Sequence, residues 1–118
     1  MSTRISSRVF LDSVDGVTVV TFADTRIVAE DVLAEVGELL GLIDGQGLAR
    51  VLIDFREVRF MSSSFLATLM KFSRRVAVAG GQVKLCGIAP DLMRVFKITC
   101  FDRLFEIYGD EGTALDSF

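Results

Sequence analysis

The residues of this sequence best suited to chemistry are three consecutive serines, Ser62, Ser63 and Ser64. They follow an apolar run that resembles a strand, and they precede an apolar segment with helical periodicity. Small hydroxyl residues just before a helix accept hydrogen bonds from the unpaired N–H groups of its first turn. The same helix end carries partial positive charge and favours an anion. A serine here can therefore cap the helix and also occupy a place where a phosphate group would be tolerated.

Enzyme chemistry has little support elsewhere in the sequence. The chain contains no histidine, which removes the commonest general base and the commonest metal ligand. It has no Gly-x-Ser-x-Gly elbow and no Gly-Lys-Ser/Thr phosphate loop. Asp54 lies within the apolar run before the serines, beside Phe55, but a phosphate-accepting aspartate needs further acidic residues to hold Mg²⁺. We therefore expect no enzymatic activity, no catalytic residue, no cofactor and no metal site.

Length and composition are typical of one folded unit. A chain of 118 residues fits one compact domain and leaves little room for a second. Its content of 51% hydrophobic and 25% charged residues suffices for a core. No apolar run approaches the roughly 18–20 residues that span a bilayer, and the first residues lack an apolar stretch behind their charges. These features predict a cytoplasmic protein with no membrane segment.

Net charge and cysteine content indicate which partners and sites to expect. The net charge is −3 and no run of Lys or Arg is present, which argues against a nucleic-acid surface. Cys86 and Cys100 lie in apolar surroundings without C-x-x-C spacing. This placement predicts two buried free thiols rather than a disulfide or a metal site.

The order of strand and helix patterns predicts an α/β fold. The expected strands are residues 9–11, 17–22, 51–55, 83–86 and 104–108; the expected helices run from Glu30 to Ile43, from the serines to Gly80, from Pro90 through Phe96, and from Thr113 to Phe118. Asp15-Gly16 predicts a hairpin, because both residues tolerate positive φ. The later alternation predicts right-handed crossovers and a mixed, mostly parallel sheet of about five strands with about four helices packed against it. The serines follow a central strand, at the sheet end where such folds carry function.

The ordered blocks of this sequence resemble the STAS domain family of bacterial anti-sigma factor antagonists. The matching blocks are residues 51–55, the stretch Val-x-Phe-Met-Ser-Ser that ends at Ser63, residues 80–87, residues 95–99, residues 101–107, and Ala114-Leu115. The resemblance implies a single STAS domain over residues 1–118, with its core at about 8–118. It also implies a binding protein in place of an enzyme.

Members of this family bind an anti-sigma factor that is also a serine kinase, in a partner-switching pathway that regulates transcription. The resemblance implies that the kinase phosphorylates a serine at the start of the second helix, that phosphorylation abolishes binding, and that a serine phosphatase restores it. By position the phosphoacceptor is Ser63, with Ser62 and Ser64 as weaker candidates. The implied partner-binding residues are Ser62, Ser63, Ser64 and Phe65. The family usually has Asp-Ser-Ser-Gly here, so Ser62 replaces an acidic residue and Phe65 replaces a glycine.

Three alternatives remain open at the level of sequence. Ser63 can be a plain N-cap, worth about 1 kcal/mol of helix stability. Phe65 is either an exposed anchor for a partner or part of the core, whereas Phe72 is expected in the core. The whole chain can be a STAS scaffold or sensor module that is never phosphorylated; a small-ligand domain would need a pocket.

Overall fold

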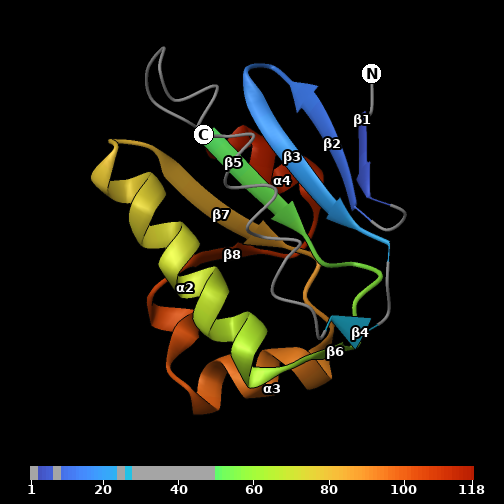
Figure 1. Cartoon of the computed structure of the whole chain (residues 1–118), viewed down its shortest axis with the longest axis vertical. Helices are drawn as coiled ribbons and strands as arrows, with labels where there is room; N and C mark the ends of the chain where they lie inside the picture. The colour runs from blue at the N-terminus through green and yellow to red at the C-terminus, as the bar shows by residue number, and fades with distance from the viewer. Residues whose placement is uncertain (1–2, 7–8, 24–25, 28–49) are drawn as a thin grey trace.

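A mixed sheet of six strands, in the order β1-β2-β3-β5-β7-β8, is the centre of the fold (Figure 1). The structure is a computed structural model that describes residues 3–6, 9–23, 26–27 and 50–118. Its strands are β1 (Thr3–Ser6), β2 (Val9–Val14), β3 (Val17–Phe22), β5 (Arg50–Asp54), β7 (Gln82–Cys86) and β8 (Glu106–Tyr108), and a separate pair is formed by β4 (Arg26–Ile27) and β6 (Phe60–Met61). The helix expected between Glu30 and Ile43 lies outside the described residues.

The first half of the sheet is antiparallel and the second half is parallel. β1 pairs with β2 and β2 with β3 in antiparallel fashion, and β3, β5, β7 and β8 then follow one another in parallel. Asp15 and Gly16 connect β2 to β3 with φ angles of 51° and 81°, which confirms the predicted hairpin. The predicted α/β class and the mixed, mostly parallel sheet are confirmed. β1, at the edge of the sheet, was not predicted.

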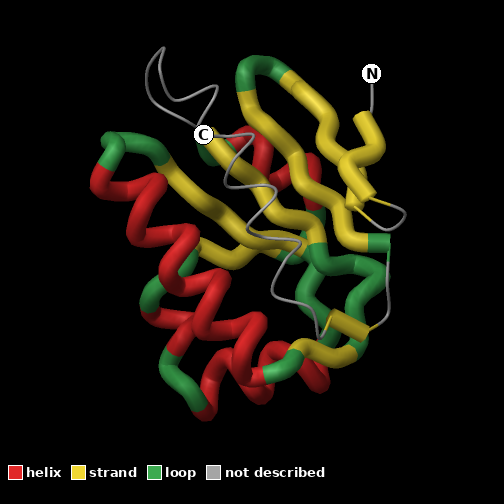
Figure 2. Tube along the Cα trace, viewed as in Figure 1, coloured by secondary structure: helices red, strands yellow, loops and turns green. Residues whose placement is uncertain are grey.

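Helices cover both faces of the sheet (Figures 1 and 2). The described helices are α2 (Ser63–Val78), α3 (Pro90–Ile98) and α4 (Glu111–Asp116), with a 3₁₀ turn, η1 (Phe101–Arg103). Residues of α2 and α3 share one buried apolar cluster with the sheet. Ala114 of α4 belongs to a second cluster, with Leu52 and Cys86 of neighbouring strands. β5 is therefore covered on both faces, as its nearly continuous apolar sequence predicts.

Element ends agree with the predicted ones, with two exceptions. Pro90 opens α3 as expected, and Gly80 ends α2 with φ of 87°. The last strand begins at Glu106, two residues later than expected, because η1 occupies the preceding segment. The terminal helix begins at Glu111, two residues earlier than expected, because the Asp110 side chain accepts a 2.7 Å hydrogen bond from Thr113 N–H and caps it there.

Candidate functional site

The serine loop, defined as Ser62, Ser63 and Ser64, lies where the chain leaves β6 and enters α2 (Figure 1). β5 ends at Asp54, and the chain then passes through β6, which pairs in parallel with β4. Met61 at the end of β6 is buried, and so is Phe65 in the first turn of α2. Buried side chains on both sides therefore hold the three serines at a defined corner of the molecule.

Ser62 is the residue that caps α2. Its hydroxyl oxygen accepts a 3.1 Å hydrogen bond from the N–H of Phe65, and its carbonyl accepts one from Leu66 N–H at 3.1 Å. The backbone of Ser62 is extended, with φ of −73° and ψ of 159°, as N-caps require. The alternative that Ser63 is the cap is therefore wrong. The chain turns into the helix one residue earlier than that alternative assumed.

The hydroxyl groups of Ser63 and Ser64 take no part in the cap. Both residues are exposed, and neither side chain makes a hydrogen bond to the residues that the structure describes. The backbone carbonyl of Ser64 accepts a 2.9 Å hydrogen bond from the Thr68 hydroxyl. The first turn of α2 contains no acidic residue. A negative charge on Ser63 would therefore meet a positive helix end without a neighbouring carboxylate in that turn.

An ion-paired corner fixes the chain between β5 and the serine loop. Arg56 donates from its backbone N–H to Asp54 Oδ1 at 3.0 Å, and its Nε lies 3.1 Å from Oδ2 of the same buried carboxylate. Arg56 Nη2 is also 3.6 Å from Glu111 Oε2, at the start of α4. A Cβ atom at Gly87 would lie 3.0 Å from Asp54 Oδ1 and 3.1 Å from Arg56 N, so this approach requires glycine.

Most of the chain matches a known protein family. Residues 11–114 match the STAS domain. The chain belongs to the STAS domain family. Within the described ranges, none of the helices of this STAS domain is long and apolar enough to cross a membrane.

Three solved structures illustrate the similarity. An anti-sigma-factor antagonist (STAS) domain protein from Planctomyces limnophilus is 26% identical with a TM-score of 0.79, over 92% of this chain and 96% of that one. An anti-sigma factor antagonist from Mycobacterium paratuberculosis is 21% identical with a TM-score of 0.74, over 99% and 97% of the two chains. The phosphorylated form of the Bacillus cell fate determinant SpoIIAA is 18% identical with a TM-score of 0.69, over 92% and 97%. The last two comparisons show a shared fold.

Phe65 of this STAS domain is part of the core. Its ring is 0% exposed and lies edge-on to the rings of Phe22, at 5.7 Å between centroids, and Phe55, at 6.4 Å. We therefore remove this side chain from the expected partner-binding residues, because a fully buried ring offers no surface to a partner. Phe72 is also buried, which confirms its predicted place in the core.

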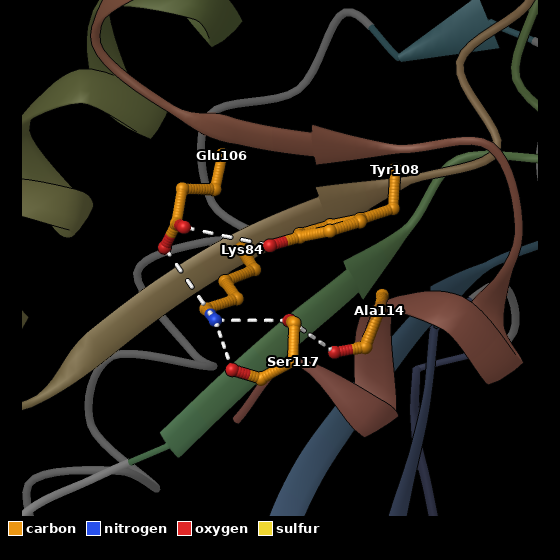
Figure 3. A network of polar contacts seen from close by, with 5 residues as sticks. All are labelled: Lys84, Glu106, Tyr108, Ala114 and Ser117. Carbon is orange, nitrogen blue, oxygen red and sulfur yellow. Dashed lines mark hydrogen bonds and ion pairs between the residues drawn. The ribbon is translucent and has the colours of Figure 1, made fainter.

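A buried lysine on the opposite face of the sheet was missed by the sequence analysis (Figure 3). Lys84 of β7 shares the α4 face with Cys86, and its Nζ donates to the Ser117 carbonyl at 2.8 Å and to the Ser117 hydroxyl at 2.9 Å. Glu106 Oε2 lies 3.5 Å from the same nitrogen, and the Phe118 ring centroid lies 4.6 Å from it. These contacts attach the chain after α4 to the sheet, on the face that α2 does not cover.

The two cysteines differ, which corrects the prediction that both are buried. Cys86 is buried, whereas Cys100 is exposed just after α3, with φ of 61°. Burial, assisted by the charge of Asp54, raises the pKa of the Cys86 thiol to about 12. In the described part of the chain, no three His, Cys, Asp or Glu side chains come together in an arrangement that could hold a metal ion.

Capping by Ser62 alone predicts different effects for two neighbouring serines. Ser62→Ala should lower the free energy of unfolding by about 1 kcal/mol, because the N–H of Phe65 loses its acceptor. Ser63→Ala should change it by less than about 0.5 kcal/mol, because the exposed hydroxyl has no described partner. Urea denaturation of both variants measures the difference. Equal losses for the two variants would show that Ser63 shares the cap.

The contrast between the thiols predicts selective alkylation. Iodoacetamide near neutral pH should modify Cys100 in the folded protein and leave Cys86 unmodified, because Cys86 is inaccessible and its thiolate form is scarce at that pH. Mass spectrometry should find one adduct before unfolding in urea and two afterwards. Adducts on Cys86 in the folded protein would contradict its burial.

Proposed function

We propose that this STAS domain is an anti-sigma factor antagonist. In this proposal it binds an anti-sigma factor of the serine-kinase type through the surface around the serine loop, in the cytoplasm, as one domain over residues 1–118. It acts as a binding protein without catalytic residue, cofactor or metal, and it contacts neither nucleic acid nor membrane. Support comes from its family and from its similarity to anti-sigma factor antagonists of known structure.

The proposed switch is phosphorylation of Ser63, which abolishes binding until a serine phosphatase removes the phosphate. One observation carries this assignment: Ser62 supplies the cap, so the exposed hydroxyl of Ser63 is available at the N-terminus of α2. Ser64 is also exposed and is the next candidate. Ser62 is the weakest, because its hydroxyl is already engaged with the backbone N–H of Phe65 and is only partly accessible. SpoIIAA, whose structure is known in a phosphorylated form, supports the idea that such a fold can carry a phosphate.

A phosphate on Ser63 would change the charge at the start of α2. It adds about −1.5 to −2 charges and three acceptor oxygens at neutral pH. The positive end of α2 and its free N–H groups accept this charge, so the domain stays folded. A partner surface formed for a neutral hydroxyl loses contact, because it would have to desolvate the dianion and any carboxylate nearby would repel it.

A phosphorylation assay with purified components tests the proposal. The chain is incubated with ATP and each anti-sigma factor of the serine-kinase type encoded in the same genome, and the modified residue is located by mass spectrometry. We expect phosphate on Ser63 of the wild type and none on Ser63→Ala. Phosphate on Ser64 alone would reassign the switch. Tight binding without modification would favour a STAS scaffold, and neither binding nor modification would contradict the proposed function.

A further inference from the structure

A half-exposed aromatic ring lies under a guanidinium group beside the serine loop. Phe60 is 40% exposed, and Cζ of Arg26 lies 4.5 Å from the centroid of its ring. The pairing of β4 with β6 brings the two together, because Arg26 and Phe60 are partners in its register. This small ribbon is separate from the main sheet, so the ring of Phe60 has less to pack against than the core phenylalanines have.

Phe60 belongs to the same surface as Ser63. Ser63 comes three positions after Phe60 in the chain, so their Cα atoms lie within about 11 Å of each other. Among the described residues, the other large hydrophobic side chains that are exposed belong to other segments and none is aromatic: Val78 at the far end of α2, Val95 and Ile98 on α3, and Leu104 after η1. Phe60, and not Phe65, is therefore the exposed aromatic residue next to the serines in the described part of the chain.

Among the described residues of β4 and of the segment between β5 and α2, the exposed side chains next to Phe60 carry more positive than negative charge, although the chain as a whole is acidic. Arg26 and Arg59 are exposed and form no ion pair with any other residue in the described ranges, whereas Arg56 is paired with Asp54 and Glu111. Glu57 is the single exposed carboxylate between Arg56 and Met61. The net charge of the chain is −3, so this local excess of arginine is distinct from its general character. A complementary partner surface carries carboxylates next to an apolar socket.

We propose that Phe60 and Arg26 form the anchor by which this domain holds its anti-sigma partner, an inference that rests on the proposed function. The ring of Phe60 enters an apolar socket on the partner, and the guanidinium of Arg26 binds a carboxylate at the rim of that socket. Aromatic residues and arginine are enriched among the few residues that dominate interface energy. Contact with the ring restrains the guanidinium, and no described residue forms an ion pair with it, so two parallel hydrogen bonds to a carboxylate would cost less side-chain entropy on binding.

The same arrangement explains how a phosphate on Ser63 would release an acidic partner. The phosphate would stand within about 11 Å of the anchor along the chain, a distance comparable to the Debye length in physiological salt. Its charge would offset that of Arg26 and Arg59 and would repel the partner's carboxylate. Binding of the unmodified chain should therefore weaken as salt rises, because part of the attraction is between charges that remain near solvent.

A titration series with matched controls tests the anchor. Each purified serine-kinase-type anti-sigma factor encoded in the same genome is titrated with the wild type, Phe60→Ala and Arg26→Glu. Ile98→Ala and Arg94→Glu are the controls, because they make the same kinds of change at exposed positions on α3. We expect each anchor variant to weaken binding by about 30-fold or more, and each control by less than about threefold. Thermal melts accompany each variant.

Two further measurements distinguish a loss of binding from a folding defect. Phe60→Leu keeps an apolar side chain, so it should bind more tightly than Phe60→Ala. Arg26→Glu should regain affinity for a partner in which the opposing carboxylate is replaced by arginine, which a folding defect would not allow. Wild-type binding combined with anchor variants that behave like the controls would overturn the anchor and leave the proposed function standing. Failure of the wild type to bind any of these anti-sigma factors would overturn the proposed function, and the anchor with it.

Discussion

Phe65→Ala is expected to lower the free energy of unfolding by about 3–5 kcal/mol. The ring is fully buried at the point where α2 meets the sheet, and it lies edge-on to Phe22 and Phe55, whose own rings stack 5.6 Å apart. Its removal takes away the transfer free energy of the ring and leaves a cavity that neighbouring aromatic rings cannot easily fill. Urea and thermal denaturation, followed by circular dichroism, measure the loss.

Phe60→Ala is the matched control for this prediction, since it deletes the same atoms at a half-exposed position only five residues away. It should cost less than about 1 kcal/mol, because less apolar surface is returned to water and little cavity is left. Together the two variants separate folding from binding: Phe65→Ala should affect stability, and Phe60→Ala should affect partner affinity. The opposite pattern would restore Phe65 as the exposed anchor and contradict its burial.

The order of elements could be predicted because each depends on short-range signals. Asp15-Gly16 favours positive φ on its own, Pro90 fits a first helical turn, and the continuous apolar run of β5 demands cover on both faces. β1 was not predicted because its four residues, Thr3–Ser6, show no clear alternation of apolar and polar side chains. They form a strand by pairing with β2. β4 and β6, of two residues each, likewise depend on partners distant in the sequence.

The site could be located from the sequence, but its internal roles could not. Three adjacent serines all suit a cap, and the choice of Ser62 depends on where the chain leaves β6. The same register decides that Phe65 turns into the core, whereas Phe60 precedes the helix on a ribbon apart from the main sheet. Cys100 is exposed because it follows the last turn of α3, although its sequence neighbours are apolar. Which residue caps the helix and which side chains are buried depend on how each segment is positioned in the folded chain. A local pattern of residue types does not specify that position.

Ser63→Asp is expected to weaken binding to the anti-sigma factor by on the order of 100-fold, equivalent to about 2.7 kcal/mol, with no loss of stability. A carboxylate in the first turn of α2 meets the positive helix end, where no other acidic residue stands, and should add about 0.3–1 kcal/mol to stability. At the interface the same carboxylate would be desolvated without a partner and would offset the charge of nearby arginines. Isothermal titration and urea denaturation measure the two effects.

The control for Ser63→Asp is Gln82→Asp, which adds the same charge at an exposed position at the start of β7, the end of the parallel sheet opposite the serine loop. It should leave binding unchanged within about threefold, because an exposed charge beyond the Debye length of about 8–10 Å is largely screened. Ser63→Ala should bind like the wild type, since the partner meets no new charge, and it should resist release when kinase and ATP are present. Undiminished binding by Ser63→Asp, together with weak binding by Ser64→Asp, would move the switch to Ser64. Equal weakening by Ser63→Asp and Gln82→Asp would instead mean that net charge, and not the position of the phosphate, governs the partner's release.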